Sequence, residues 1–471
     1  MKKNIMFVGV SICLLILLGI GLSYSMWNMR VSQDTDNVIS TTDCFDITLA
    51  NQSNAIKLDN AYPITDTKGK TLTPFTFSIK NVCDTAVAYT VSLENLEGTT
   101  LASDYLKVMV NNNEPLLLNS LSTTDVVNTT SIESRVLDTG TLFKNNTKEY
   151  SIRLWIDYNT TLDDLNNETK VLKSKIIIKG VPSNEKESLD YRVTYLSKTD
   201  TVNLATDDAD KNVRYIGANP NNYVYFNCSD YNNPTADTCE LWRIIGVFNN
   251  VTKSDGSKEN LVKIIRADFL GNYSWDDNSV NDWSTATLQQ NLNSGTYYTT
   301  TLKNDTTRNA IEEVVWNLGG TDNHYSSASN GLASHWYGYE RGTTVYSGRP
   351  TTWTGKIGLM YPSDYGYATS GGTTKDRAAC LAKELLYWDS SEFSDCKGND
   401  YLFDANNGQW TLAPCSAYAY YVYSVGRGGI VTRGSASYPY DAVRPALFLK
   451  SSILVDKGTG ESSNPYTLKI Q

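Results

Sequence analysis

Two histidines and two pairs of adjacent carboxylates are the residues of this chain whose types could support catalysis. His324 and His335 lie eleven residues apart in a stretch rich in Gly, Ser and Asn. No nucleophile motif accompanies them, and no nearby cysteines complete a zinc site. Asp276-Asp277 and Glu312-Glu313 would serve glycoside hydrolysis only at a carboxyl separation that sequence does not reveal. We therefore expect loop histidines and a protein that is not an enzyme, without catalytic residues, metal or cofactor; a surface hydrolase is the weakest alternative.

The cysteines are better suited to structure than to chemistry. Eight are present, and Cys13 lies inside an apolar run. Cysteines of an exported protein are by default paired in disulfides, although sequence alone does not fix their connectivity. The spacing favours three local pairs, Cys44 with Cys83, Cys228 with Cys239, and Cys380 with Cys396. Cys415 is then left over, and we expect a buried thiol there; a reactive thiol or an intermolecular bridge is the alternative.

The apolar run that contains Cys13 spans residues 5–22 and follows two lysines. About 18 residues are enough to cross a bilayer as a helix, and the lysines favour a cytoplasmic N-terminus. Ser23 and Ser25 have the small-x-small spacing of a signal-peptidase site. Residues 1–26 are therefore expected to be either a cleaved signal peptide or a retained signal anchor. Both place the rest of the chain outside the cell, on the outer face of the membrane or secreted.

Length, charge and composition limit the remaining options. The length predicts two domains, and the excess of Asn, Asp, Thr, Ser and Tyr favours strands and turns over helices. The net charge of −10 is evenly divided, since residues 216–471 carry 20 basic and 25 acidic side chains and the rest carry 21 and 26. Without a basic patch or stripe, nucleic-acid binding has no electrostatic support.

Residues 27–182 are predicted to form a β-sandwich. Apolar residues nearly alternate over Leu72–Ile79 and Tyr150–Ile156, as expected for strands with one buried face. Further strand-like runs lie at 105–110 and 171–178, separated by Asn-rich turns. Several short strands at this spacing favour a sandwich.

Two of these stretches, Leu72–Asn81 and Tyr150–Asp157, together with the leading apolar run and an early Cys, resemble the camelysin and TasA group of bacterial surface and biofilm-fibre proteins. The resemblance covers roughly residues 1–182 and implies a jelly-roll-like sandwich and self-assembly through this half. Camelysins have been classed as metallopeptidases. This half, however, contains no histidine and no HExxH motif, so we expect no peptidase activity.

Residues 183–215 have few large apolar side chains and carry the acidic cluster Asp207-Asp208-Ala209-Asp210. The cluster lacks the ligand periodicity and the final Glu of a calcium loop. We therefore predict a solvated linker between two domains.

Residues 216–471 are predicted to form an α+β domain, and they hold eight of the ten tryptophans and 22 of the 31 tyrosines. Three helices are predicted, one capped by Ser284, one over 306–317 capped by Asp305, and one over 378–386 after Asp376. Strands are predicted at 223–226, 242–248, 262–265, 417–425, 430–433 and 443–449, the fourth and fifth as a hairpin.

Four stretches stand out in this half: Cys239–Ile245, Asn281–Ser284, Trp410–Leu412 and Val443–Pro445. Together they resemble an uncharacterised family of extracellular domains of Gram-positive gut bacteria. The segment from Tyr418 to Arg444 is similar to the C-type-lectin-like fold of the Fibrobacter major paralogous repeat and of formylglycine-generating enzymes. The resemblance implies a C-type-lectin-like α+β domain, but fold does not carry function. Solitary Cys415 does not supply those enzymes' copper-binding cysteine pair, and Asn281-Asp282-Trp283 departs from the calcium-lectin order.

The expected ligand-binding residues are Trp336, Tyr339 and Trp353, with Arg427 at the predicted hairpin turn. The three aromatics lie in a Gly/Ser/Thr-rich stretch over 319–372, and long irregular segments on a packed scaffold often carry recognition. Tyr and Trp provide large contact areas and stack on sugar rings. The alternative is that these aromatics fill the core, as we expect for Trp242, Trp316 and Trp410. Arg444 is expected to be a buried structural arginine.

The leading hypothesis is an exported cell-surface adhesin, with a sandwich stalk and a lectin-like head that binds a glycan or a host or bacterial surface protein. Membrane attachment would depend on residues 5–22 if they are retained. The alternative is a structural subunit of an extracellular fibre that assembles through the N-terminal half. Cleavage after Ser25 would favour the secreted subunit over the tethered adhesin.

Overall fold

The computed structural model describes residues 45–49, 62–83, 85–127, 131–161, 163–165, 170–321 and 331–470. The chain divides into two compact units, Met1–Lys186 and Glu187–Gln471, and each is described by itself. The expected membrane segment and its cleavage site lie outside the described residues. Within those ranges no helix is long and apolar enough to span a membrane.

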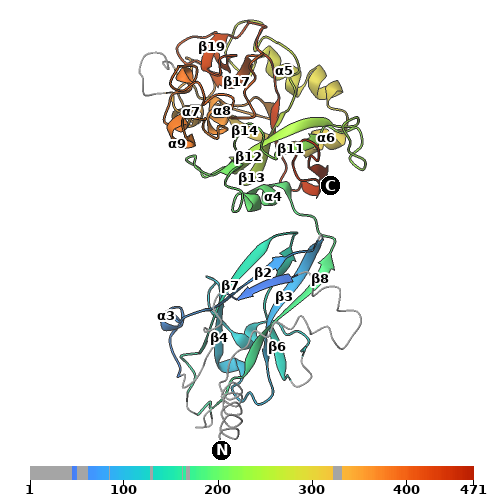
Figure 1. Cartoon of the computed structure of the whole chain (residues 1–471), viewed down its shortest axis with the longest axis vertical. Helices are drawn as coiled ribbons and strands as arrows, with labels where there is room; N and C mark the ends of the chain where they lie inside the picture. The colour runs from blue at the N-terminus through green and yellow to red at the C-terminus, as the bar shows by residue number, and fades with distance from the viewer. Residues whose placement is uncertain are drawn as a thin grey trace, which may run out of the picture. The chain divides into compact units, whose positions relative to one another are not determined.

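The first unit is a β-sandwich of two antiparallel sheets (Figure 1). Its strands are β1 (Phe45–Leu49), β2 (Phe75–Asn81), β3 (Ala86–Asn95), β4 (Leu106–Val110), β5 (Leu116–Leu117), β6 (Glu133–Leu142), β7 (Thr147–Ile156) and β8 (Ser174–Ser183), with a short helix α3 (Asp66–Gly69) before β2. The five-stranded sheet has the order β1-β2-β7-β4-β5, and the three-stranded sheet has the order β6-β3-β8. The inner faces meet in one core that includes Phe77, Ile79 and Tyr150 from one sheet and Val91 and Ile176 from the other.

Alternating burial in β2, where every second side chain from Phe75 to Asn81 is buried, confirms the period-two prediction for this strand. The strands predicted at 105–110, 150–156 and 171–178 correspond to β4, β7 and β8. Local alternation was sufficient for β2 because its buried and partly exposed side chains alternate along the whole strand.

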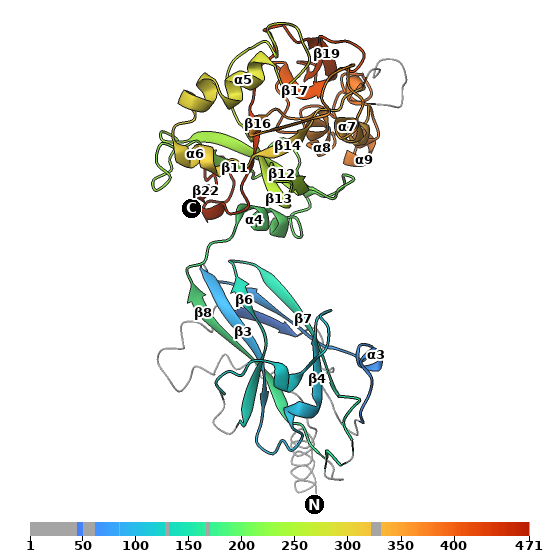
Figure 2. The ribbon, with the colours of Figure 1, turned by 180° about the vertical axis from the view of Figure 1, so that it is seen from behind.

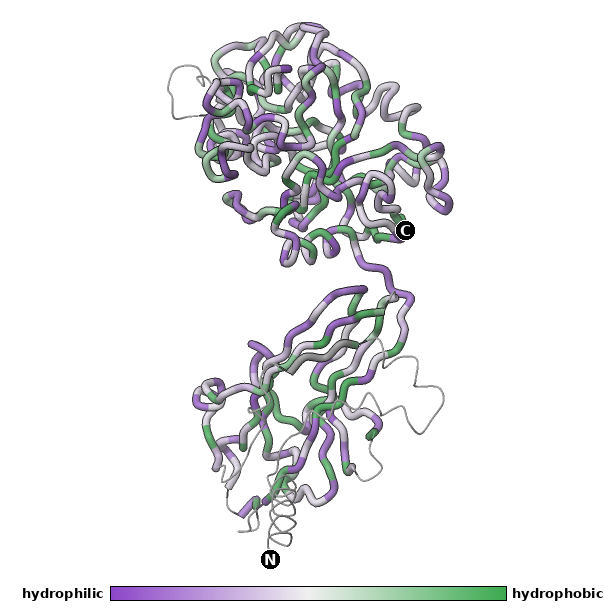
Figure 3. Tube along the Cα trace, viewed as in Figure 1, coloured by the Kyte–Doolittle hydropathy of each residue, from purple (hydrophilic) through white to green (hydrophobic). Residues whose placement is uncertain are grey.

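The second unit is built on a seven-stranded sheet with the order β16-β20-β13-β12-β10-β9, in which β11 also pairs with β12. Its strands are β9 (Leu204–Ala205), β10 (Val213–Tyr215), β11 (Tyr223–Phe226), β12 (Glu240–Thr252), β13 (Lys258–Arg266), β16 (Ile357–Gly358) and β20 (Ala446–Leu449). Smaller sheets pair β14 (Val314–Asn317) with β15 (Thr352–Gly355), join β17 (Gln409–Pro414), β18 (Tyr421–Val425) and β19 (Val431–Ser435), and pair β21 (Leu454–Lys457) with β22 (Thr467–Lys469). Hydrophobic stretches run through the centre of this unit (Figure 3).

Short helices surround these sheets. They are α4 (Leu189–Leu196), α5 (Thr287–Asn293), α6 (Asp305–Ala310), α7 (Ala333–Glu340), α8 (Pro362–Tyr367) and α9 (Arg377–Leu381). Figures 1 and 2 show α5 and α6 on one side of the unit and α7, α8 and α9 on the other. The second unit is therefore α+β, as predicted, with strands more numerous than helices.

Two of the three predicted helices differ from the structure in extent. The helix expected over 306–317 is capped by Asn304 instead of Asp305 and ends at Ala310. Strand β14 follows, with Trp316 paired to Trp353 of β15. Its apolar residues have helical spacing, but β-branched side chains such as Val314 also suit a strand, and pairing with β15 decides between the two. The helix after Asp376 is confirmed with its cap, since the Asp376 side chain accepts from the Ala379 N–H, but it ends at Leu381.

The third predicted helix begins later than expected. Asp282 accepts hydrogen bonds from the Ser284 N–H (3.0 Å) and hydroxyl (2.6 Å), so Ser284 is held in a turn and does not cap the helix. Helix α5 starts at Thr287 with Ala286 at the N-cap position. Leu288 and Leu292 are buried on it, as the pattern predicted.

The expected linker over 183–215 is wrong for its larger part. Helix α4 and strands β9 and β10 lie in this range, and β10 pairs with β12 of the central sheet. Leu189, Val193 and Tyr215 are buried in the core of the second unit. The second unit therefore begins at Glu187, not at residue 216. The acidic cluster misled the prediction because Asp208, which was expected in solvent, is buried beside a buried arginine.

Disulfides Cys228–Cys239 and Cys380–Cys396 are present as predicted. Cys83 is also disulfide-bonded, and Cys44, its predicted partner, lies outside the described residues. Cys415 is a buried free thiol, which confirms the structural expectation for this residue.

Candidate functional site

The aromatic residues expected to bind a ligand lie in or against the core. Trp336 is 1% exposed, and its ring packs edge-on against Tyr423 with the centroids 4.7 Å apart. Tyr339 and Trp353 are partly buried against the same core. Trp336 is therefore corrected from a surface residue to a core residue, because α7 turns its ring inward. Trp242, Trp316 and Trp410 are buried as expected.

The two arginines lie as the sequence predicted. Arg427 is exposed at the turn between β18 and β19. Arg444 is 6% exposed, and its guanidinium donates to the backbone carbonyls of Arg266 (2.8 Å) and Leu402 (3.2 Å). Arg444 is therefore structural.

The two members of the Asp276-Asp277 pair differ in burial. Asp276 is buried, and its oxygens accept from the backbone N–H groups of Val280 and Thr287, both at 3.0 Å. Asp277 is exposed. His335 lies beside Tyr339, and His324 lies outside the described residues. Within the described ranges no group of three or more His, Cys, Asp or Glu side chains is arranged to hold a metal ion.

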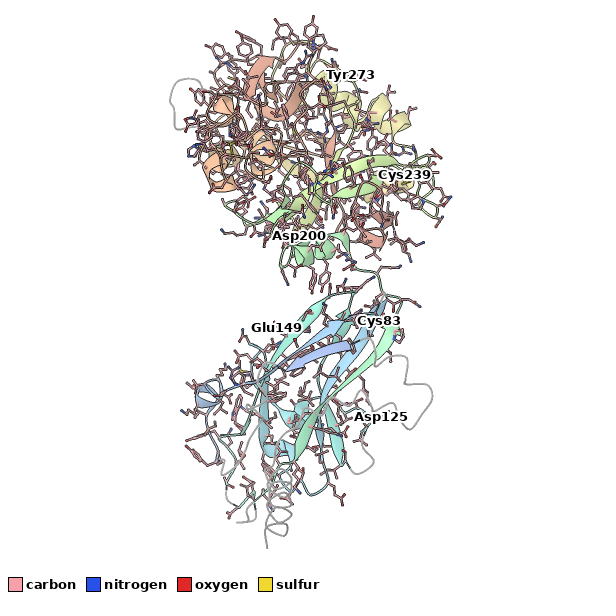
Figure 4. All side chains as sticks on the ribbon, in the orientation of Figure 1. Cys83, Asp125, Glu149, Asp200, Cys239 and Tyr273 are labelled. Carbon is pink, nitrogen blue, oxygen red and sulfur yellow. A yellow bond between two sulfur atoms is a disulfide. The ribbon has the colours of Figure 1, made fainter. Side chains whose placement is uncertain are left out.

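Strands β17 and β19 lie at one end of the second unit (Figure 1), and exposed tyrosines flank the hairpin of β18 and β19. Among the described residues of this unit, five of the eight exposed large hydrophobic side chains belong to this group. We call the five the tyrosine surface: Tyr273, Tyr418, Tyr420, Tyr438 and Tyr440, each between 40% and 66% exposed. Figure 4 labels Tyr273 at this end. A concentration of exposed aromatic rings on a polar, well-packed domain marks an interaction surface.

Backbone hydrogen bonds fix the three segments that carry the tyrosine surface. The Asn281 side chain is 1% exposed and donates to the carbonyls of Tyr418 (2.8 Å) and Tyr421 (3.0 Å). The Ala436 N–H donates to the Tyr420 carbonyl (2.7 Å), and the Tyr273 N–H donates to the Asp441 carbonyl (3.2 Å). Loops more than 130 residues apart in the sequence are thereby held together, so the rings are presented from a rigid base.

The rings also contact one another. Tyr438 and Tyr440 lie 5.9 Å apart between centroids, and Tyr418 and Tyr420 lie 6.0 Å apart. The Arg433 guanidinium lies 5.0 Å from the Tyr418 ring centre, within the range of a cation–π contact. These contacts limit the rotamers of the exposed rings and reduce the entropy that binding would cost.

Sequence reasoning missed the tyrosine surface because it assigned Tyr418 and Tyr420 to a strand. In the structure β18 begins only at Tyr421, so both lie in the preceding loop. Tyr438 and Tyr440 follow a Gly-Ser-Ala-Ser run. Aromatic residues in such a polar turn were the available signal.

A buried ion-pair network lies in the second unit, away from these tyrosines. Arg214 donates to Asp208 (2.7 Å) and to Asp364 (2.9 Å), and Lys263 donates to the other Asp364 oxygen (2.5 Å). All four side chains are at most 2% exposed. Burial opposes ionisation of Asp364, but Lys263 and Arg214 outweigh it and lower its pKa. Burial lowers the pKa of Lys263 in spite of this partner.

Asp364 also connects the network to a helix. It is the third residue of α8, and its Oδ2 accepts from the Tyr361 N–H (2.9 Å) at the N-cap. The network therefore joins β10, β13 and α8, and its role is structural.

Comparison with known proteins assigns no family to the chain. No protein-family model matches it, and no curated protein matches it either. A functional proposal must therefore be based on the structure of the chain itself.

Proposed function

We propose that this protein is an exported, non-enzymatic adhesin of a Gram-positive bacterium. Its first unit would be a jelly-roll-like stalk of the camelysin and TasA type. Its second unit would be a C-type-lectin-like head that binds a glycan. Residues 5–22 would tether it to the membrane if they are retained after export, and otherwise it would be secreted. The disulfides are consistent with an oxidising compartment.

The observation that carries this proposal is the tyrosine surface. Exposed aromatic rings interact unfavourably with water, and a sugar ring covers them through its C–H face while its hydroxyls stay solvated. Arg433 is in cation–π contact with Tyr418 of this surface, and a neutral glycan is the ligand class that we favour. A surface protein of the host or of another bacterium is the second class of ligand.

Replacing two of the rings should abolish most of the binding. We expect Tyr438→Ala with Tyr440→Ala to lower affinity for the bound glycan at least about 10-fold, which corresponds to about 1.4 kcal/mol. These two rings are the most exposed of the group, so their removal leaves the core intact. A glycan and mucin array probed with the full chain in detergent would identify the ligand, and titration would give both affinities.

Tyr191→Ala with Tyr387→Ala is the matched control, because these tyrosines are 41% and 39% exposed on the same unit but lie outside the tyrosine surface. The control pair should leave affinity unchanged. An array without any signal, or an equal loss in both double variants, would contradict the proposed function.

One observation favours the alternative function of a fibre subunit. Strands β6 and β8 are both ten residues long and form the two edges of the three-stranded sheet, and Val181 of β8 is 56% exposed. Long exposed edges are templates for pairing with another chain. If β8 pairs with a second copy, Val181→Lys should suppress fibres that electron microscopy detects in the wild type. Monodisperse monomers of the wild type under assembly conditions would exclude this function.

A further inference from the structure

The second unit contains a recess that shares no residue with the tyrosine surface. Its volume is about 150 Å³, below the roughly 300–1,000 Å³ of pockets for drug-sized ligands. The end of β12, strand β14, helix α7 and the N-cap of α8 contribute its walls. A recess of this size accommodates one small ring and excludes a long ligand.

The walls combine buried aromatic rings with polar side chains. Trp316 and Tyr361 are among the rings, but they are only 1% and 5% exposed, so the polar side chains provide most of the contacts available to a ligand. Asn250, Thr252 and Asn317 line the same recess, and their side chains are in no hydrogen bond with other described residues. Side-chain amides and hydroxyls both donate and accept, so these three groups match the hydroxyls of a ligand.

The charged groups of the recess are already compensated. Lys263 is paired with Asp364 at 2.5 Å. Arg341 donates to Glu340 (3.3 Å) and lies 3.9 Å from Asp210, and its guanidinium stacks on the Tyr337 ring at 3.3 Å. A charged ligand would have to displace one of these partners and leave a charge unpaired. The recess therefore favours a neutral ligand.

We propose that the recess binds one neutral sugar residue, such as the terminal hexose or N-acetylhexosamine of a glycan. Asn250, Thr252 and Asn317 would form hydrogen bonds with its hydroxyls. A terminal residue fits because the recess holds a single ring. This inference deepens the proposed function by naming a ligand class, but the site is separate from the tyrosine surface and binds free monosaccharides in its own right.

The test uses the full chain in detergent and saturation-transfer NMR with neutral hexoses and N-acetylhexosamines. We expect at least one of them to bind with a Kd in about the millimolar range, as a ligand of this size allows. Sialic acid serves as the anionic probe and should not bind. Asn250→Gly with Asn317→Ala should weaken binding at least 10-fold. Glycine suits position 250 because φ is 54° there.

A second variant, Thr252→Phe, fills the recess without removing either amide and should also prevent binding. Asn278→Ala, an exposed substitution outside the recess, is the control and should bind as the wild type does. The Tyr438→Ala, Tyr440→Ala variant should retain monosaccharide binding, which separates this inference from the proposed function. The inference is overturned if no neutral monosaccharide binds, if sialic acid alone binds, or if binding survives both recess variants.

Discussion

Asp364→Asn is expected to lower the free energy of unfolding of the second unit by about 3–5 kcal/mol, the usual cost of removing one partner from a buried ion pair. The two Asp364 oxygens accept from Arg214, Lys263 and the Tyr361 N–H. An asparagine there has one accepting oxygen and one donating nitrogen. At least one of the two buried cations would then face a donor and lose its acceptor.

Chemical denaturation followed by tryptophan fluorescence measures this effect, since eight of the ten tryptophans lie after residue 215. Asp305→Asn is the matched control. Asp305 also lies in the first turn of a helix and pairs with Arg308 at 2.8 Å, but its side chain is 87% exposed. An exposed pair contributes at most about 1 kcal/mol. A loss below about 1 kcal/mol for Asp364→Asn would show that the network does not hold the fold.

The second large effect is a pH dependence centred on Glu340. Burial raises the pKa of this fully buried carboxyl to about 7, although Arg341 and Ser363 favour its charged form. Between its ordinary pKa of 4.5 and about 7 the folded state therefore binds a proton that the unfolded state releases. Its contribution to stability is complete below pH 4.5 and is lost as the pH rises through 7. At 1.36 kcal/mol per pKa unit the loss is about 3 kcal/mol.

Glu340→Gln should remove this dependence. Its side-chain oxygen can still accept from the Ser363 N–H, as Glu340 does at 2.9 Å. The free energy of unfolding of the wild type should fall between pH 4.5 and 7, and that of the variant should fall less. Asp400, whose pKa is raised to about 6 by burial, contributes in the same direction and remains in both proteins. Parallel pH profiles for the two proteins would contradict this assignment.

The local sequence pattern predicted the strands whose side chains alternate between buried and exposed positions, and the disulfides that join cysteines close in the sequence. Strand β2 has one buried face and one exposed face, so alternation identified it, and β11 was predicted at its observed bounds, Tyr223–Phe226. The pairs Cys228–Cys239 and Cys380–Cys396 are short-range, so spacing sufficed. Pattern failed over 311–317, where one apolar run suits a helix or a strand and only pairing with β15 decides.

The candidate sites were less predictable, because exposure depends on packing. Trp336 and Tyr440 are both large aromatics in polar stretches of sequence. In the structure Trp336 is 1% exposed and Tyr440 is 66% exposed. The sequence showed that this half is rich in aromatic side chains. It did not show which of these rings are buried in the core, because burial depends on packing between elements far apart in the chain.

By itself the sequence determined that the chain is rich in strands, that its two halves differ, and that two local disulfides close loops in the second half. Each conclusion rests on interactions between near neighbours. Only the tertiary structure decided that Asp208 is buried rather than solvated, and that Tyr273, Tyr418 and Tyr440 share one surface. The physical reason is that burial, charge pairing and shared surfaces depend on contacts between residues that are distant in the sequence, such as Arg214 with Asp364. The free energy of such contacts cannot be read from the residues near either partner.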